Sequence, residues 1–182
     1  MDFPPKQSKR IMGEESLDRA LTRIAHEICE TSIGINRLVL LGIHTRGVPL
    51  ARRIARKIEF SESVTIPVGS LDIGLYRDDL STGYAPPLKA SQIPELTNKR
   101  IVIVDDVLFT GRTIRAAMDA IIDFGRPQII QVAVVVDRGH RELPIKPDYV
   151  GKNIPTNVGQ KVRVAVFEID NFDAVELKED AK

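Results

Sequence analysis

One stretch of the chain decides the fold: VDDVLFTGRTIRAA, residues 104–117. The apolar run RIVIV leads into it, and TIRAAMDAIIDF continues from it with helical spacing of its apolar residues. Two adjacent carboxylates, Asp105 and Asp106, therefore stand with a Thr-Gly-Arg-Thr turn between a strand and a helix. Neighbouring carboxylates repel each other, and glycine and hydroxyl side chains add little to a core. A ligand site would explain this corner, and a charged, capped strand-to-helix turn is the alternative.

Apolar runs and helical repeats alternate along the rest of the chain. The run RLVLLGI, residues 37–43, is typical of a strand buried on both faces, and a helix is predicted to start at Pro49. A first helix is predicted in SLDRALTRIAHEICE, with Ser16 as its N-cap. Extended segments are predicted in SVTIPVGSLDIGLY, RIVIVDD, QIIQVAVVVD and KVRVAVFEID. This alternation predicts an α/β fold with a mostly parallel central sheet flanked by helices.

We interpret residues 1–182 as a single domain, the size for which one core suffices. Residues 1–15 are predicted to be a polar, mobile tail. Residues 76–98 are rich in polar residues and proline and form a long connection for a compact domain, so we expect a flexible lid loop.

Composition excludes several classes of protein. Hydrophobic residues make up 43% and charged residues 28%, a globular balance, and no apolar run has the length of a membrane span. The net charge of +1 is far below that of proteins that coat nucleic acid, so RNA binding would need a local patch. Without a secretory signal, and with Cys29 as the one cysteine, we expect a cytoplasmic protein without disulfides or membrane association.

Polar clusters follow three of the predicted strands: Thr45-Arg46-Gly47, the acids with Thr110–Thr113, and Asp137-Arg138. The carboxyl ends of parallel strands meet at one edge of a sheet, where α/β proteins bind ligands. The unpaired amides at a helix start attract phosphate, and adjacent carboxylates accept ribose hydroxyls or hold hydrated Mg²⁺. The predicted ligand is therefore a sugar phosphate.

The run VIVDDVLFTGRT resembles the signature of type I phosphoribosyltransferases, which bind 5-phosphoribosyl-1-pyrophosphate (PRPP). Together with GIHTRG, LYRDDL and VDRGHRELPIKPDYVGKNIPT, it resembles the PyrR family of pyrimidine-operon attenuation regulators, from Leu17 to the final strand. That resemblance implies a type I phosphoribosyltransferase fold with a small hood at residues 138–160. It also implies two activities: binding of leader mRNA, controlled by uridine nucleotides, and conversion of uracil and PRPP to UMP and pyrophosphate.

The resemblance also assigns residues. Asp105 and Asp106 would hold the ribose hydroxyls, with Mg²⁺ nearby, bound through PRPP rather than by direct protein ligands. The implied catalytic residues are these two acids with Arg77 and Asp78 of the lid. The implied PRPP-binding residues are Thr45, Arg46, Asp105, Asp106, Val107, Leu108, Phe109, Thr110, Gly111, Arg112 and Thr113. The implied uracil and nucleotide residues in the hood are Asp137, Arg138, Lys152, Asn153 and Ile154.

For RNA, the resemblance implies a surface built from at least a dimer, and the polar, solvent-facing candidates are Thr22, His26, His140, Arg141 and Lys152. Aromatic residues are only 5% of the chain, so such contacts would come mainly from basic and hydroxyl side chains. The basic side chains at 52, 53, 56 and 57 are better explained as a solvated helix face. Two other functions stay open: a salvage phosphoribosyltransferase without RNA regulation, and a nucleotide sensor without turnover.

Overall fold

The computed structural model describes residues 8–31, 33–76, 92–157 and 159–179. Its centre is a five-stranded parallel sheet in the order β3-β2-β4-β5-β6. The strands are β2 (Leu38–Ile43), β3 (Val68–Leu71), β4 (Arg100–Leu108), β5 (Ile129–Asp137) and β6 (Tyr149–Asn153). The predicted α/β class and parallel sheet are confirmed.

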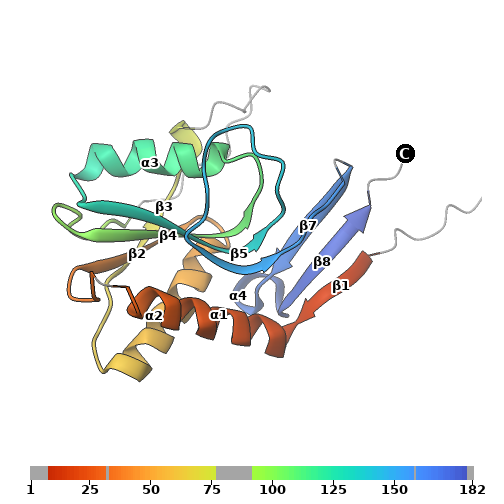
Figure 1. Ribbon diagram of the computed structural model, residues 1–182, viewed down its shortest axis with the longest axis horizontal. Helices are drawn as coiled ribbons and strands as arrows, with labels where there is room; N and C mark the ends of the chain where they lie inside the picture. Colours follow the sequence, from red (N-terminus) through yellow and green to blue (C-terminus); the bar gives the residue numbers. More distant parts are fainter. Residues whose placement is uncertain (1–7, 32, 77–91, 158, 180–182) are drawn as a thin grey trace, which may run out of the picture.

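Helices cover both faces of this sheet (Figure 1). On one face lie α1 (Glu14–Cys29) and α2 (Gly47–Glu62), and on the other lies α3 (Arg112–Phe124), with a short 3₁₀ turn, η1 (Gly74–Tyr76), near it. Alternate residues of β2 enter two separate apolar clusters, Leu38 and Leu40 under α1 and α2, and Val39 and Leu41 under α3. Burial on both faces explains why this strand is apolar throughout.

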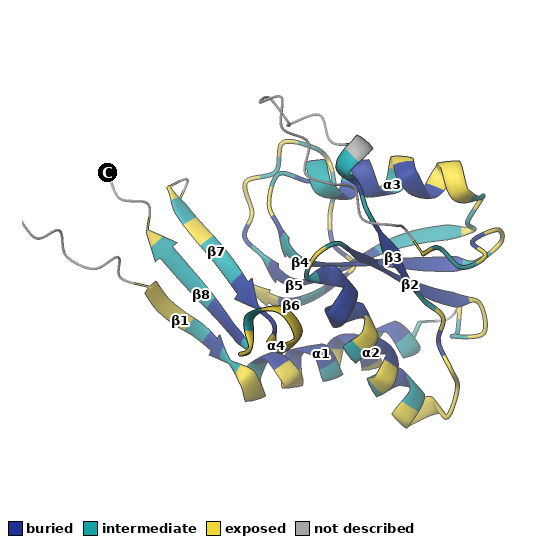
Figure 2. Ribbon diagram, turned by 180° about the vertical axis from the view of Figure 1, so that it is seen from behind, coloured by how far each residue is buried: buried dark blue, intermediate teal, exposed yellow. Residues whose placement is uncertain are grey.

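A second, antiparallel sheet lies beside the first, in the order β1-β8-β7 (Figure 1). It contains β1 (Ser8–Gly13), β7 (Gln160–Ala165) and β8 (Ala174–Glu179), and the one-turn helix α4 (Phe167–Asp170) connects β7 to β8. The inner ends of these strands are buried and their outer ends exposed (Figure 2). The last predicted strand thus belongs to this small sheet and not to the central one.

Three predicted segments differ in part from the structure. The predicted tail includes Ser8–Gly13, which pair with β8 and bury Met12, and α1 starts at Glu14. The predicted hood includes Tyr149–Asn153, which form an edge strand of the central sheet. Of the predicted lid, residues 77–91 lie outside the described residues, but Gln92 pairs with Ser70 and Leu96 is fully buried. In each case, contacts with distant residues order a locally polar segment.

None of the described helices is long and apolar enough to span a membrane.

Candidate active site

The loops after β2, β4 and β5 meet at one edge of the central sheet, as predicted. The Arg138 N–H donates to the Leu108 carbonyl at 3.1 Å, and the Glu142 N–H to the Thr110 carbonyl at 3.0 Å. A Cβ atom on Gly47 would lie only 2.3 Å from the Val104 carbonyl oxygen. Only glycine therefore allows the loop after β2 to approach β4 just before its two acids.

The two acids are held by their own backbone. One oxygen of Asp105, which is buried, accepts the Asp106 N–H at 2.9 Å, and one oxygen of Asp106 accepts the Val107 N–H at 2.8 Å. Burial raises the pKa of Asp106, while the Val107 amide, Asp105 and the positive charge of Arg46 oppose that rise. An arriving hydroxyl or cation would stabilise the ionised forms of both acids.

The predicted phosphate turn opens helix α3. Gly111 has a φ of +95°, a conformation that favours glycine, and it directly precedes the helix. The cavity here, about 310 Å³, is lined by Val107–Thr113 together with Glu142. The first turn of α3 contains no acidic residue, so its amides and the helix dipole favour an anion. Arg112 donates to Glu142 at 2.7 Å, a partner that the sequence did not predict.

Arg46, predicted to hold pyrophosphate, lies between the acids and the small sheet. Its Nε and Nη2 atoms donate to the two carboxylate oxygens of Asp170, at 3.1 and 2.9 Å. This hydrogen-bonded pair raises the pKa of Arg46 and lowers the pKa of Asp170. Thr45 is exposed in the same loop, and the His44–Thr45 peptide bond is cis.

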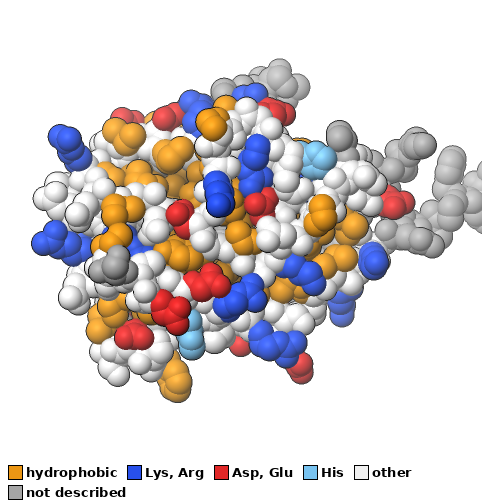
Figure 3. Space-filling view, in the orientation of Figure 1, with side chains coloured by type: hydrophobic (Ala, Val, Ile, Leu, Met, Phe, Trp, Pro, Cys, Tyr) orange, Lys and Arg blue, Asp and Glu red, His pale blue; other side chains and the backbone are white. Residues whose placement is uncertain are grey.

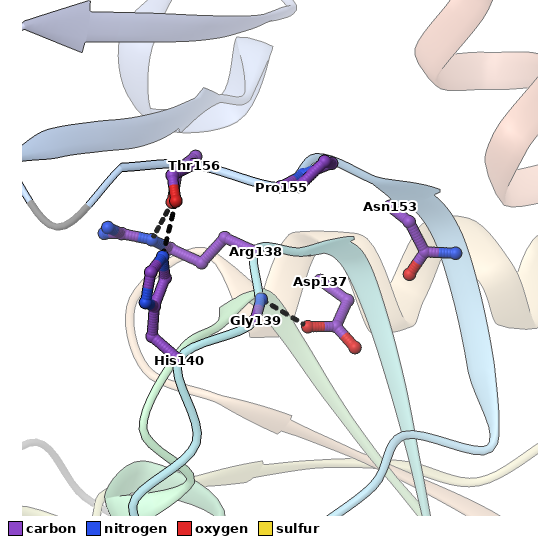
Figure 4. A pocket seen from close by; sticks show the side chains of 7 residues that line it. All are labelled: Asp137, Arg138, Gly139, His140, Asn153, Pro155 and Thr156. Carbon is purple, nitrogen blue, oxygen red and sulfur yellow. Dashed lines mark hydrogen bonds between the residues drawn. The ribbon is translucent and has the colours of Figure 1, made fainter.

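Three of the five predicted base-binding residues, Asp137, Arg138 and Asn153, line a second cavity of about 490 Å³, here called the hood cavity (Figure 4). Asp137 and Asn153 are neighbours in the β5–β6 register, and their side chains lie together at its mouth. Arg138 is buried, which lowers its pKa, and it donates to the Thr156 hydroxyl at 3.1 Å and to the Gln160 carbonyl at 2.7 Å. Lys152 is exposed and Ile154 is buried beside this cavity. Thr156 and Gln160 lie within the predicted hood, but no local pattern in the sequence marks them as partners of Arg138.

The interpretation of Arg141 as solvent-facing is wrong. Its guanidinium donates to Asp137 at 2.6 Å, to the Phe109 carbonyl at 2.8 Å and to the Ile145 carbonyl at 2.9 Å. These contacts turn the side chain inward, where it links the loop after β4 to the loop after β5. His140 is exposed, but its Nε2 lies 2.5 Å from the Thr156 carbonyl, so it too closes the hood cavity.

The other candidates for RNA contacts lie on α1 and β6. Thr22 donates to the Asp18 carbonyl at 2.9 Å, and His26 is exposed one turn further on. Arg23 donates to the Val150 carbonyl at 3.1 Å and also to that of Gly151, which places α1 against the strand that carries Lys152. Lysine and arginine side chains are interspersed with acidic ones on the face drawn in Figure 3. Arg77 and Asp78 lie outside the described residues.

Comparisons with known proteins agree with this geometry. The family model of the phosphoribosyl transferase domain matches residues 11–170. The "Bifunctional protein PyrR" of Thermoanaerobacter sp. is 58% identical over 96% of this chain and 99% of that protein. The protein of the same name from Deinococcus deserti is 56% identical over 92% of each chain.

Two solved structures have folds similar to that of this chain. The hypoxanthine phosphoribosyltransferase of Staphylococcus aureus has a TM-score of 0.69 at 19% identity, over 92% of this chain and 90% of that one. A Trypanosoma cruzi hypoxanthine phosphoribosyl transferase has a TM-score of 0.72 at 16% identity, over 99% and 95%. At sequence identities this low, the similarity shows only that the folds are shared. From the domain match and the PyrR relatives, the chain belongs to the phosphoribosyl transferase family and, within it, to the bifunctional PyrR proteins.

Proposed function

We propose that the protein transfers the phosphoribosyl group of PRPP to uracil, giving UMP and pyrophosphate. One observation supports this proposal above all. The paired acids, Arg46 and the turn at Gly111 meet at one edge of the sheet, beside the hood cavity. A uracil ring nitrogen would form the new bond to the anomeric carbon as the bond to pyrophosphate breaks, and the proton of that nitrogen would leave with the pyrophosphate. Asp105 and Asp106 would accept the ribose hydroxyls, and the amides at the start of α3 would bind the 5-phosphate.

Mg²⁺ belongs to the same proposal, bound through PRPP near the two acids. Carboxylate oxygens are the ligands that Mg²⁺ prefers, and two adjacent acids, one of them buried, tolerate their mutual repulsion best beside a cation. When bound, the ion would neutralise the leaving pyrophosphate. Arg46 would share that task, because a guanidinium binds phosphate oxygens in pairs. Arg77 and Asp78, which lie outside the described residues, are proposed as further catalytic residues. The transition state would be oxocarbenium-like, so water would have to be excluded from it.

We also propose that the protein is a cytoplasmic, at least dimeric, regulator that binds pyrimidine-operon leader mRNA together with a uridine nucleotide. Membership of the bifunctional PyrR proteins supports this second role. The exposure of His26 and Lys152 on adjoining elements supports an RNA contact there. Thr22 and His140 remain further proposed RNA-binding residues. A nucleotide in the hood that raises RNA affinity must itself be bound more tightly by the same factor when RNA is present.

Two measurements test both roles. The first is RNA affinity for the hairpin upstream of the pyrimidine genes, with and without UMP or UTP, at fixed salt, because phosphate contacts are salt-dependent. The second is UMP formation from uracil and PRPP. Tight, nucleotide-strengthened binding with turnover is the expected result. Turnover without specific RNA binding would leave a salvage enzyme, and binding without turnover a sensor.

A further inference from the structure

We propose that Asp170 is a positioning residue that fixes the Arg46 guanidinium for the pyrophosphate of PRPP. This inference rests on the proposed transferase function and extends it to α4, which follows the small sheet's strand β7. Asp170 itself would not touch substrate. Its role would be to hold the one cation of the loop after β2 in a single orientation.

The geometry of the pair is that of a fixed clamp. Both oxygens of Asp170 accept from Arg46, through the edge formed by Nε and Nη2. This bidentate contact fixes the plane of the guanidinium as well as its place. Within the described part of the chain, no hydrogen-bond partner is seen for Nη1, so the opposite edge of the guanidinium stays available. The Arg46 side chain is 30% exposed and the Asp170 side chain only 7%, so the carboxylate is buried while part of the arginine remains accessible.

The anchor is itself rigid. Asp170 also accepts the Val166 N–H at 3.0 Å and a guanidinium hydrogen of Arg163 at 2.9 Å. Arg163 stands on β7, so the carboxylate is held from its own helix and from the small sheet. A carboxylate with this many donors cannot rotate without losing several charge-assisted hydrogen bonds.

Arg46 also interacts electrostatically with the proposed reacting centre. Its positive charge acts on Asp106, lowering the pKa of that acid against the effect of burial. The guanidinium is thus hydrogen-bonded to Asp170 and also interacts electrostatically with Asp106, one of the acids proposed to hold ribose. An arginine without an anchor would be drawn toward those acids and away from the leaving group. Asp170 counters this pull, because it holds the guanidinium by two of its nitrogen atoms, Nε and Nη2.

The test variant is Asp170→Asn, which keeps the size of the side chain but removes its charge and one of its acceptor atoms. We expect the affinity for inorganic pyrophosphate, measured by calorimetry, to fall by about 10- to 100-fold, and kcat/KM for PRPP to fall in parallel. UMP affinity should stay within about twofold of wild type, since UMP carries no pyrophosphate. Should this variant fail to fold, Asp170→Glu serves instead, since it keeps the charge but displaces the carboxylate, and the same selective loss is expected.

The matched control is Arg53→Gln. Arg53, on α2, binds Glu168 and Asp173 on either side of Asp170, at 2.6 Å each, but not the loop after β2. It should lower thermal stability without changing pyrophosphate affinity. Adding Asp170→Asn to Arg46→Gln should cause no further loss of pyrophosphate binding, because the anchor then has nothing to position.

Equal losses of UMP and pyrophosphate binding in Asp170→Asn, or the same loss in Arg53→Gln, would overturn the proposal in favour of a structural role. An unchanged pyrophosphate affinity would overturn it as well. Pyrophosphate binding by wild type without any UMP synthesis would reject the proposed activity and still leave the anchoring role measurable.

Discussion

The guanidinium carbon of Arg138 lies 3.9 Å from the centroid of the Phe109 ring, so that the residues directly after the neighbouring strands β4 and β5 stack against each other. The ring of His140 meets the same phenyl ring edge-on, with centroids 6.0 Å apart. Phe109 thereby connects the phosphate turn to the hood cavity. A phenyl ring in this place has no proton to exchange, so its contribution is to hold Arg138 in position.

Phe109→Leu should therefore weaken uracil binding more than PRPP binding. A cation–π contact of this kind contributes about 1 kcal/mol, so we expect the KM for uracil to rise about fivefold. The KM for PRPP should stay near that of wild type, since the backbone of the turn is unchanged. Steady-state kinetics with each substrate varied in turn measures both. Phe109→Tyr keeps the ring and is the control; an equal rise of both KM values in Phe109→Leu would contradict the assignment.

Replacing Asp105 and Asp106 together by Asn should abolish UMP synthesis while the fold persists. Each lost charged acceptor costs about 2 kcal/mol of ribose binding, so a loss of at least about 100-fold in kcat/KM is expected. Burial already disfavours the charged form of Asp106, as its raised pKa shows, so the melting temperature should not fall. Turnover assays and thermal unfolding monitored by circular dichroism measure the two effects. Unchanged turnover would remove the acids from the proposed mechanism.

The sequence predicted those elements whose own residues are sufficient to form them. The helix over 113–124 and its end at Gly125 followed from spacing and from a stop signal, and β2 and β4 from unbroken apolar runs. The meeting of three polar clusters followed from the rule that parallel strands place their carboxyl ends at one edge.

The rest depended on partners far away in the chain. The polar segment SKRIMG becomes β1 because β8, more than 160 residues later, pairs with it. The short, partly polar YVGKN becomes β6 because β5 offers an edge. The sequence separation between Arg46 and Asp170 is 124 residues, so no local pattern marks them as partners. Arg141 was predicted to face solvent because a sequence shows its charge but not the four acceptors around its guanidinium.

Arg100 should be a major source of stability. It is buried at the start of β4 and donates to the carbonyls of Ile28 and Gly34, to Gln131 and to the Tyr149 hydroxyl at 2.7–3.2 Å. Arg100→Met would leave these acceptors unpaired in the core, and we expect the free energy of unfolding to fall by about 3 kcal/mol. Tyr149→Phe removes only one of the contacts and should cost about 1 kcal/mol. Urea unfolding measures both, with Arg52→Met on the exposed face of α2 as a control near zero.

The pH dependence of stability should reveal the Asp170 clamp. Arg46, Arg163 and the Val166 amide lower the pKa of Asp170 in the folded protein, so the unfolded chain takes up its proton first as the pH falls. The stabilisation is then fully present above the unfolded pKa of about 3.9 and is lost as the pH falls from there toward the folded value. Arg46 is partly exposed and screened by solvent, so we expect about 2 kcal/mol.

The comparison of wild type with Asp170→Asn in urea, from pH 8 down to pH 3, measures this effect. The difference in unfolding free energy should be constant between about pH 5 and pH 8 and shrink below about pH 4. A difference that changes between pH 6 and pH 8 would assign the stabilisation to another titrating group.

RNA binding should separate from catalysis on the surface of α1 and β6. His26 on α1 and Lys152 on β6 are exposed, so His26→Ala with Lys152→Ala should weaken binding of the leader hairpin by about 10-fold or more. UMP synthesis should fall much less, because the acids, the turn and Arg46 are untouched. Filter binding at two salt concentrations, beside turnover assays, measures the two activities; the salt dependence should become shallower if a phosphate contact has been removed.

Arg141→Ala is the informative comparison for that pair. Its guanidinium holds Asp137 and the carbonyl of Phe109, and it is only 22% exposed. Its removal should loosen the hood cavity, so UMP synthesis should fall. Because less nucleotide would then be bound in the hood, the strengthening of RNA binding by nucleotide should fall as well. RNA affinity measured without nucleotide should change little. A loss of nucleotide-free RNA binding as large as that of the double variant, with turnover intact, would instead place Arg141 in direct contact with RNA.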